Sequence, residues 1–151
     1  QLRLRQLDEL LESGRVRVGE VLQPFIRYAQ SHGVSIEGVP AFEQAALALP
    51  DSSGRLAARA ASVLTSNSLN AGSTSIAFEV LSTQRSLELT LTDNGPGFTL
   101  DSVPAGRGLW TLMDQLGPGS LRVEPRQGGG STVTASIRID SEADNVNNSP
   151  G

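Results

Sequence analysis

The sequence predicts an α+β fold, a two-layer sandwich in which helices cover one face of a mixed, mostly antiparallel sheet. Three observations support this prediction. In the first half of the chain, apolar residues recur every three to four positions. In the second half they alternate with polar residues, with one further helical stretch between the alternating segments. The resulting order lacks the regular strand–helix alternation of a doubly wound fold.

Length and composition limit the possible classes of protein. A chain of 151 residues that is 38% hydrophobic and 19% charged is long enough for one globular core. A net charge of −4 argues against a non-specific nucleic-acid binder. All 12 basic residues are arginines, which excludes a P-loop lysine and every lysine nucleophile. The absence of cysteine and the presence of one histidine, His32, exclude thiolate and multi-histidine metal sites.

The sequence also bears on the cellular location. It contains no apolar run long enough to span a bilayer, and its first residues alternate charge with leucine instead of forming a signal peptide. A chain without cysteine is typical of a reducing compartment. We therefore expect a cytoplasmic protein, connected to a membrane only through segments outside this sequence.

The first elements are predicted to be helical. Leucines at helical spacing indicate a short amphipathic helix that ends at Gly14. A second helix is expected over residues 16–31, closed by His32 and Gly33, and the alternation over 34–39 predicts a strand. The segment 42–49 is alanine-rich, and its pattern leaves strand and helix both open.

The next helix is predicted to begin at Pro50-Asp51-Ser52-Ser53, where an Asp or Ser side chain would cap free N–H groups, and to end at Asn70 before Gly72. Beyond it the period changes from 3.6 to 2. The chain is expected to form strands over 76–80, 87–92, 121–123 and 133–139, and a helix over 108–116. Residues 141–151 contain almost nothing to bury and are predicted to be a disordered tail.

The strongest functional motif is Asp93-Asn94-Gly95-Pro96-Gly97-Phe98, directly after an alternating strand. A carboxylate at a strand end, followed by two glycines that flank a proline, gives a rigid turn that a flat ligand can approach closely. A plain surface turn explains the hexapeptide equally well when it is considered alone.

Two further glycine-rich segments follow. Gly106-Arg107-Gly108-Leu109 opens the helix over 108–116, and the free N–H groups of such a helix end attract phosphate. Gly128-Gly129-Gly130-Ser131-Thr132 precedes the last strand. Close helix packing accounts for the first pattern as well, and a flexible hairpin loop accounts for the second.

In this order the motifs resemble the GHKL, or Bergerat-fold, ATPases, most closely the catalytic ATP-binding domain of sensor histidine kinases of the NarL-partnered class. The resemblance covers about residues 34–139, and DNGPGF followed by GRGL is its specific part. It implies a Bergerat fold, with ATP and Mg²⁺ as cofactors. It also implies that residues 34–140 form the ATP-binding domain and that residues 1–33 are N-terminal helices, the linker or remnant of a dimerisation region.

The resemblance assigns roles to individual residues. Asp93 would accept a hydrogen bond from the adenine amino group, while Gly95 and Gly97 let the base and sugar approach. The phosphates would be wrapped by Gly106 and Gly108, beneath a helix that continues at Leu109.

Two further assignments come from the same resemblance. Residues 98–105 would form a very short ATP lid. Thr132, or Ser131 beside it, falls where the family has a threonine near the adenine-binding aspartate.

The helix before the first hairpin departs from the family pattern of Glu, then Asn four residues later, then His or Asn four beyond. Alignment on Asn70-Ala71-Gly72 places Ser62, Ser66 and Asn70 at these positions. A serine hydroxyl is a poorer Mg²⁺ ligand than an amide oxygen. Asn67 is the alternative ligand, although it lies about 100° around the helix from Ser66. Ser62 and Ser68 are expected to belong simply to an exposed or half-buried helix face.

A histidine kinase also needs an acceptor histidine on a dimerisation helix. His32 does not fit, because no acidic residue follows it and it lies at a predicted helix terminus beside glycine. The expected partners are therefore a phosphoacceptor-histidine helix domain outside this sequence, a response regulator, and a second copy in a full-length homodimer, with no nucleic acid. Two alternatives remain open: a pseudokinase-like module with weak or no nucleotide binding, and a serine kinase of the anti-sigma-factor type.

Overall fold

A five-stranded sheet is the centre of the computed structural model, which describes residues 15–83, 85–96 and 108–139. Its strand order is β2-β4-β5-β7-β6. The strands are β2 (Ser35–Gly38), β4 (Ser75–Ser82), β5 (Ser86–Asp93), β6 (Leu121–Pro125) and β7 (Ser131–Arg138). β2 runs parallel to β4 and the other neighbours are antiparallel, which confirms the predicted sheet.

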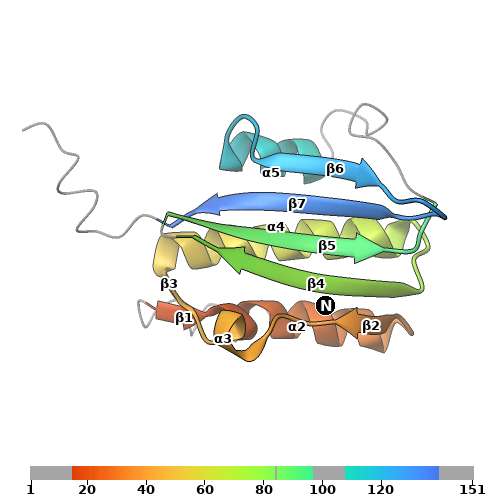
Figure 1. Cartoon of the computed structure of the whole chain (residues 1–151), viewed down its shortest axis with the longest axis horizontal. Helices are drawn as coiled ribbons and strands as arrows, with labels where there is room; N and C mark the ends of the chain where they lie inside the picture. The colour runs from red at the N-terminus through yellow and green to blue at the C-terminus, as the bar shows by residue number, and fades with distance from the viewer. Residues whose placement is uncertain (1–14, 84, 97–107, 140–151) are drawn as a thin grey trace, which may run out of the picture.

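The main helices form the second layer. They are α2 (Val18–Ser31), α4 (Asp51–Asn70) and α5 (Gly108–Leu116). Figure 1 shows α4 behind β5 and β7, and α5 behind β6. Alternate residues of β5, namely Leu87, Leu89 and Leu91, are buried in the core shared with the helices. The predicted two-layer α+β sandwich is therefore confirmed.

The opposite face of the sheet carries paired hydroxyl groups. Oγ1 of Thr90 lies 3.1 Å from Oγ1 of Thr134, and Oγ1 of Thr92 lies 3.4 Å from Oγ1 of Thr132. These threonines of β5 alternate with the buried leucines, so their side chains point away from the helices. This polar face suits an antiparallel sheet that is covered on one side only.

The N-terminal part of the fold differs from the prediction in detail. The predicted helix over 16–31 begins at Val18, because β1 (Arg15–Arg17) pairs antiparallel with β3 (Ala48–Pro50). The segment 42–49, open between helix and strand, contains both: α3 (Phe42–Ala45) is followed by β3.

α2 belongs to the same core as the sheet. Its apolar stripe, which includes Val21, Leu22, Phe25 and Ala29, is buried in one cluster with the residues of β4, β5 and β7. α2 therefore packs against the sheet within this core. His32 is the C-cap residue of α2, as predicted, and its Nδ1 lies 2.9 Å from the carbonyl oxygen of Tyr28.

The start of α4 corrects the capping prediction. Pro50 occupies the N-cap position, and no side chain caps the helix there. Asp51 lies within the first turn, where a carboxylate favours the helix dipole, and its Oδ1 lies 3.4 Å from Nε of Arg55. The predicted N-terminal amphipathic helix, the lid over 98–105 and the C-terminal tail lie outside the described residues. Within the described ranges, no helix is both long and apolar enough to cross a membrane.

Candidate functional site

The start of the motif after β5 and the glycines before β7 lie at one end of the sandwich. β5 ends at Asp93, β7 begins at Ser131, α4 ends at Asn70 and α5 begins at Gly108. The ends of β5 and α4 and the start of β7 lie toward the right-hand end of the molecule in Figure 1, and α5 begins nearer the middle, against α4. The end of α4 and the start of β7, which are 61 positions apart in the chain, therefore lie at the same end of the sheet as Asp93.

Asp93 is the central side chain of this end and is 4% exposed. Its Oδ1 accepts hydrogen bonds from the backbone N–H groups of Gly95 and Ser131, each at 3.1 Å. Its Oδ2 accepts one from the hydroxyl of Ser68 at 2.6 Å. No salt bridge to this carboxylate is found among the described residues. Because a carboxylate offers about four acceptor sites, one site on Oδ2 has no donor among the described residues.

Ser68 is a correction to the sequence analysis, which expected an exposed or half-buried helix face. The residue is 2% exposed and faces Asp93. It continues the buried stripe of α4 that runs through Ala57, Ala61 and Leu64. Those residues follow the helical period, so the same spacing predicts that residue 68 faces the sheet.

Two positions beside Asp93 have no space for a side chain. A Cβ on Gly95 would lie 2.8 Å from Oγ of Ser73. Gly130 has a φ of +102°, and a Cβ there would overlap the carbonyl group of Asp93. Oγ of Ser73 is itself buried and has no hydrogen-bond partner within the described part of the chain.

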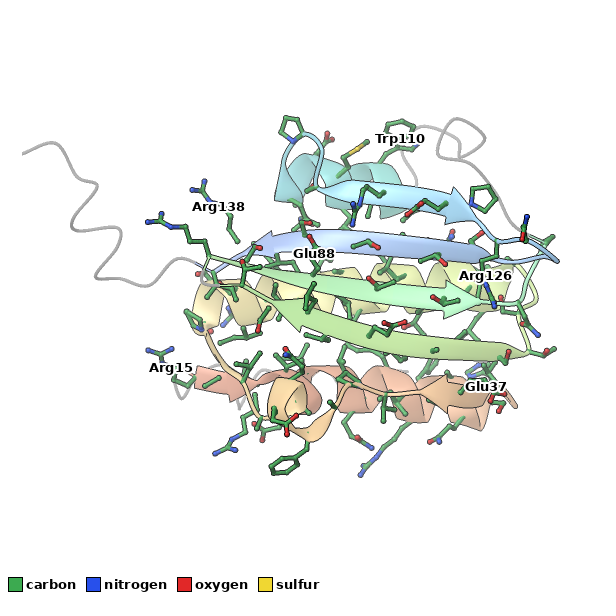
Figure 2. All side chains as sticks on the ribbon, viewed as in Figure 1. Arg15, Glu37, Glu88, Trp110, Arg126 and Arg138 are labelled. Carbon is green, nitrogen blue, oxygen red and sulfur yellow. The ribbon has the colours of Figure 1, made fainter. Side chains whose placement is uncertain are left out.

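Two other side chains fix the turn after β5. The Oδ1 of Asn94 accepts hydrogen bonds from the N–H groups of Thr74 at 2.9 Å and Ser75 at 3.0 Å, and its Nδ2 donates to Oγ1 of Thr74 at 2.8 Å. Nη1 of Arg126 donates to the carbonyl oxygen of Asp93 at 2.9 Å, and Figure 2 shows this arginine at the same end of the sheet. The turn that carries the carboxylate is therefore held by β4 on one side and by the β6–β7 connection on the other.

The last strand places Ser131, not Thr132, beside the carboxylate. Asp93 and Ser131 are partners in the β5–β7 ladder, and the side chain of Thr132 pairs with Thr92 on the opposite face of the sheet. Thr132 was the expected site residue, with Ser131 as its alternative, and the alternation of side chains along β7 decides between them. Ser131 and the buried Val133 are two positions apart on β7, so their side chains lie on the same face of the sheet. This alternation could have identified Ser131 as the inward-facing residue from the sequence.

The N-terminus of α5 lies against α4. A Cβ on Gly108 would contact Cγ1 of Val63 at 3.4 Å, so glycine lets the two helices approach closely there. Leu109 is 1% exposed and anchors the first turn in the core, which leaves only its backbone to face a ligand. The expected site residues Gly97 and Gly106 lie outside the described residues, and so does Arg107.

Helix geometry distinguishes the two candidate metal ligands. Ser68 faces Asp93, and Ser66 lies about 160° away from it around α4, on the side remote from the carboxylate. Asn67 lies four residues after Val63, so it occupies the same side of α4 one turn closer to the site. Asn67 is therefore situated between Asp93 and the start of α5, and its amide oxygen suits Mg²⁺. Asn70 is exposed at the end of the helix.

The described residues contain no cluster of three His, Asp or Glu side chains that could hold a metal alone. A magnesium ion is commonly held by one or two protein oxygens together with waters and substrate phosphates. A single amide at position 67 is therefore compatible with an ion that arrives with a nucleotide.

The fold was compared with known proteins. No family model matches the chain, and no curated protein does. Solved structures do match. The mycobacterial sensor histidine kinase MprB superposes with a TM-score of 0.61 at 18% identity, covering 83% of this chain and 96% of that one. The ATP-binding domain of PrrB from Mycobacterium tuberculosis gives 0.62 at 17% identity, covering 84% and 97%.

A third match is the histidine kinase domain of the E. coli osmosensor EnvZ, with a TM-score of 0.58 at 15% identity over 84% of this chain and 89% of that one. The chain has the fold of a histidine kinase ATP-binding domain. The match covers nearly the whole of each of these domains, so the sandwich corresponds to a complete unit of that fold.

Within this histidine kinase fold, some residues of the site were not predicted from the sequence. Ser68, Asn94 and Arg126 all act on Asp93 or its turn, through partners 20 to 33 residues away in the chain. The helical spacing of the buried residues on α4 predicts that the side chain of Ser68 faces the sheet. The bonds of Asn94 and Arg126 depend on strand pairing, which no local pattern reveals.

Proposed function

We propose that the chain is the ATP-binding catalytic domain of a two-component sensor histidine kinase. It binds ATP at the Asp93 end of the sandwich and transfers the γ-phosphate to a histidine outside this sequence. The observation that carries the proposal is the Asp93 carboxylate, which is buried, held by three donors and left with one acceptor site.

The carboxylate suits the amino group of adenine. A purine needs few polar contacts in a mostly apolar slot, and an acceptor that is already fixed costs little entropy on binding. Gly95 and Gly130 let the turn after β5 and the start of β7 pack closely against Asp93, which holds the acceptor in place. The solved ATP-binding domain of PrrB, which shares the fold, supports a nucleotide as the ligand.

The phosphates would lie toward α5. The free N–H groups at its N-terminus, beginning at Gly108, supply partial positive charge for a phosphate. Asn67 would hold a Mg²⁺ ion on the facing side of α4, and the ion would neutralise phosphate charge. The remaining contribution of the domain is to position the γ-phosphate for an incoming histidine.

The proposal implies partners that the chain does not contain. His32 lies at the end of α2, where its Nδ1 is close to the carbonyl oxygen of Tyr28. We therefore do not assign it as the phosphate acceptor. The acceptor would lie on a separate helical domain, in a homodimer of the full-length protein, and a response regulator would receive the phosphate. We place this domain in a bacterial cytoplasm, where such systems operate.

Isothermal titration with ADP and an unhydrolysable ATP analogue, with and without Mg²⁺, tests the proposal. The native chain should bind in the micromolar range, and the ATP analogue should bind more tightly with Mg²⁺. Asp93→Asn replaces an acceptor oxygen with a donor and should reduce affinity by at least about 100-fold, since a buried polar group facing the wrong partner is costly. Asp114→Asn, at an exposed position on α5, removes the same charge as a control and should leave affinity unchanged.

One observation favours a second candidate, a pseudokinase-like module that uses the fold for signalling without turnover. The family's metal-binding asparagine aligns with Ser66, which is remote from Asp93. If the native chain shows no binding at about 1 mM nucleotide, a Kd equivalent to roughly −4 kcal/mol, the pseudokinase is the correct assignment.

A further inference from the structure

Three large apolar side chains are well exposed on the described surface, and all three lie around α3. They are Val39 in the β2–α3 connection, Phe42 at the start of α3 and Leu81 near the end of β4, with exposed fractions of 59%, 84% and 60%. The hydroxyl of Ser82 donates to Oε1 of Gln44 at 3.2 Å, which holds α3 beside the end of β4. Figure 1 shows α3 in the left half of the molecule, away from the end at which β5 and α4 finish. Exposed apolar side chains that gather in one place commonly mark a contact surface.

A shallow groove lies beside Phe42, between α3 and the first turn of α2. It has a volume of about 350 Å³, and its lining includes the small residues Gly19, Ala45 and Ala46. Phe42 also lines the groove but is 84% exposed, so its ring stands at the edge and does not fill the space. Because a cavity of about 150 Å³ is enough for a benzene ring, the groove has room for a phenylalanine side chain from another molecule.

The same groove carries charges of both signs. Arg17 and Glu20 belong to its lining, and both are exposed. Oε1 of Glu20 accepts a hydrogen bond from the backbone N–H of Arg17 at 3.1 Å, and no ion pair of either side chain is found among the described residues. The guanidinium group and the second carboxylate oxygen can therefore meet opposite charges on a partner.

We infer that this surface binds a second copy of the chain about a two-fold axis. Phe42 of each copy enters the groove of the other, and Arg17 of each copy faces Glu20 of the other. A two-fold contact requires one surface to be complementary to itself, and this surface carries the aromatic ring, the space for a ring and both charges. An anionic membrane or a nucleic acid would instead be matched by charges of one sign.

The contact should be weak. Stable interfaces bury about 800 Å² on each partner, which a surface built around three apolar side chains does not reach, so we expect a Kd of about 0.1 to 1 mM. At the concentration of about 5 µM that is usual in unfolding experiments, the chain would then be monomeric. In the full-length homodimer, which rests on the proposed function, two tethered copies reach an effective concentration in the millimolar range, enough to form the contact.

Sedimentation equilibrium of the whole 151-residue chain, without nucleotide, tests the inference. The native chain should pass from monomer toward dimer between about 0.02 and 2 mM, a range that includes the expected Kd. Phe42→Asp puts a charge where the ring would enter the groove and should raise the Kd at least about tenfold. Circular dichroism should show a native fold, since residue 42 is 84% exposed. A native chain that stays monomeric at about 2 mM, or Phe42→Asp that dimerises like the native chain, would overturn the inference.

Charge reversal tests the two-fold arrangement itself. Arg17→Glu and Glu20→Arg each bring like charges together at two symmetric places, and each should raise the Kd at least about fivefold. An equimolar mixture of the two variants should associate like the native chain, because each side chain at position 17 again faces one of opposite charge at position 20. Arg59→Glu, at an exposed position of α4, changes the net charge as Arg17→Glu does and should leave the Kd unchanged.

The controls separate this contact from the nucleotide site. If the mixture of the two folded variants does not associate better than either alone, or if Arg59→Glu weakens the dimer as much as Arg17→Glu, the inference is wrong. Glu20→Gln keeps an acceptor for the N–H of Arg17 and covers the case in which Glu20→Arg does not fold. It should raise the Kd about twofold, and a native Kd in this variant would also contradict the inference. None of these measurements involves nucleotide, so failure here leaves the proposed function standing.

Discussion

Gly130 crosses the end of β5 so closely that a Cβ on it would lie 2.9 Å from the carbonyl carbon of Asp93. Its φ of +102° is in the range that side chains rarely adopt. The close approach brings the start of β7 against the strand end that carries the carboxylate. Position 130 is therefore restricted to glycine by two independent causes, the backbone conformation and the lack of space.

Gly130→Ala should lower the free energy of unfolding by about 3 kcal/mol, because backbone strain and overlap with Asp93 act together. Gly128→Ala is the matched control in the same turn: its φ is +85°, but nothing lies within 4 Å of a Cβ there. It should cost only about 1 kcal/mol. Urea denaturation followed by circular dichroism measures both values, and equal losses would contradict the close contact at position 130.

Alanine substitution of two phenylalanines tests whether α2 belongs to the core. Phe25 on α2 is 0% exposed and Phe42 on α3 is 84% exposed. Phe25→Ala should cost about 3–5 kcal/mol of unfolding free energy through the lost burial and the cavity. The free energy of unfolding of Phe42→Ala should differ from that of the native chain by no more than about 0.5 kcal/mol. A small effect of Phe25→Ala would mean that α2 is not part of the cooperative unit.

Asn67→Ala should remove most of the increase in ATP-analogue affinity that Mg²⁺ gives to the native chain, because the amide oxygen is the proposed protein ligand of the ion. Without Mg²⁺, in the presence of EDTA, the variant and the native chain should bind alike. Titrations at several Mg²⁺ concentrations measure the dependence.

Ser66→Ala is the neighbouring control, on the side of α4 away from Asp93, and its Mg²⁺ dependence should be native. The reverse result, with the metal effect lost in Ser66→Ala and kept in Asn67→Ala, would show that α4 presents the face that alignment with the family predicts.

Asn94→Ala should destabilise the protein by about 2 kcal/mol, because it removes three hydrogen bonds that join the turn to Thr74 and Ser75 at a partly solvated position. Asn94→Asp keeps the acceptor for both N–H groups and loses only the donor to Thr74, so its cost should be smaller. Thermal unfolding of the two variants gives the comparison. A larger loss for Asn94→Asp would indicate that the backbone contacts contribute little.

The long elements could be predicted because each has one buried face. The leucines of β5 and the apolar stripe of α2 follow periods of 2 and 3.6 over enough residues to be unambiguous. β1 and β3 are three residues each, too short for a period, and they exist because they pair with each other. The sequence contains no local signal for that pairing.

The site was predictable to a similar degree. Asp93 was placed correctly at a strand end, because the alternating strand leads directly to it. Thr132 was expected near Asp93, with Ser131 as its alternative, and the strand register places Ser131 opposite Asp93 while the side chain of Thr132 lies on the other face of the sheet. The role of either residue in nucleotide binding stays a prediction. The preference for Asn67 over Ser66 required the structure, since it depends on which side of α4 faces α5.

α4 carries Asn67 and Ser68 as consecutive residues, one toward α5 and the other toward the strand-end carboxylate. A helix rotates about its axis as a rigid body. Any repacking that rotates α4 therefore moves the side chains of Asn67 and Ser68 together. A change of base specificity made by moving α4 would therefore also displace Asn67, the proposed ligand of the Mg²⁺ ion. Substitutions that introduce new polar side chains are better placed on β7 or in the turn after β5, because they leave the orientation of α4 unchanged.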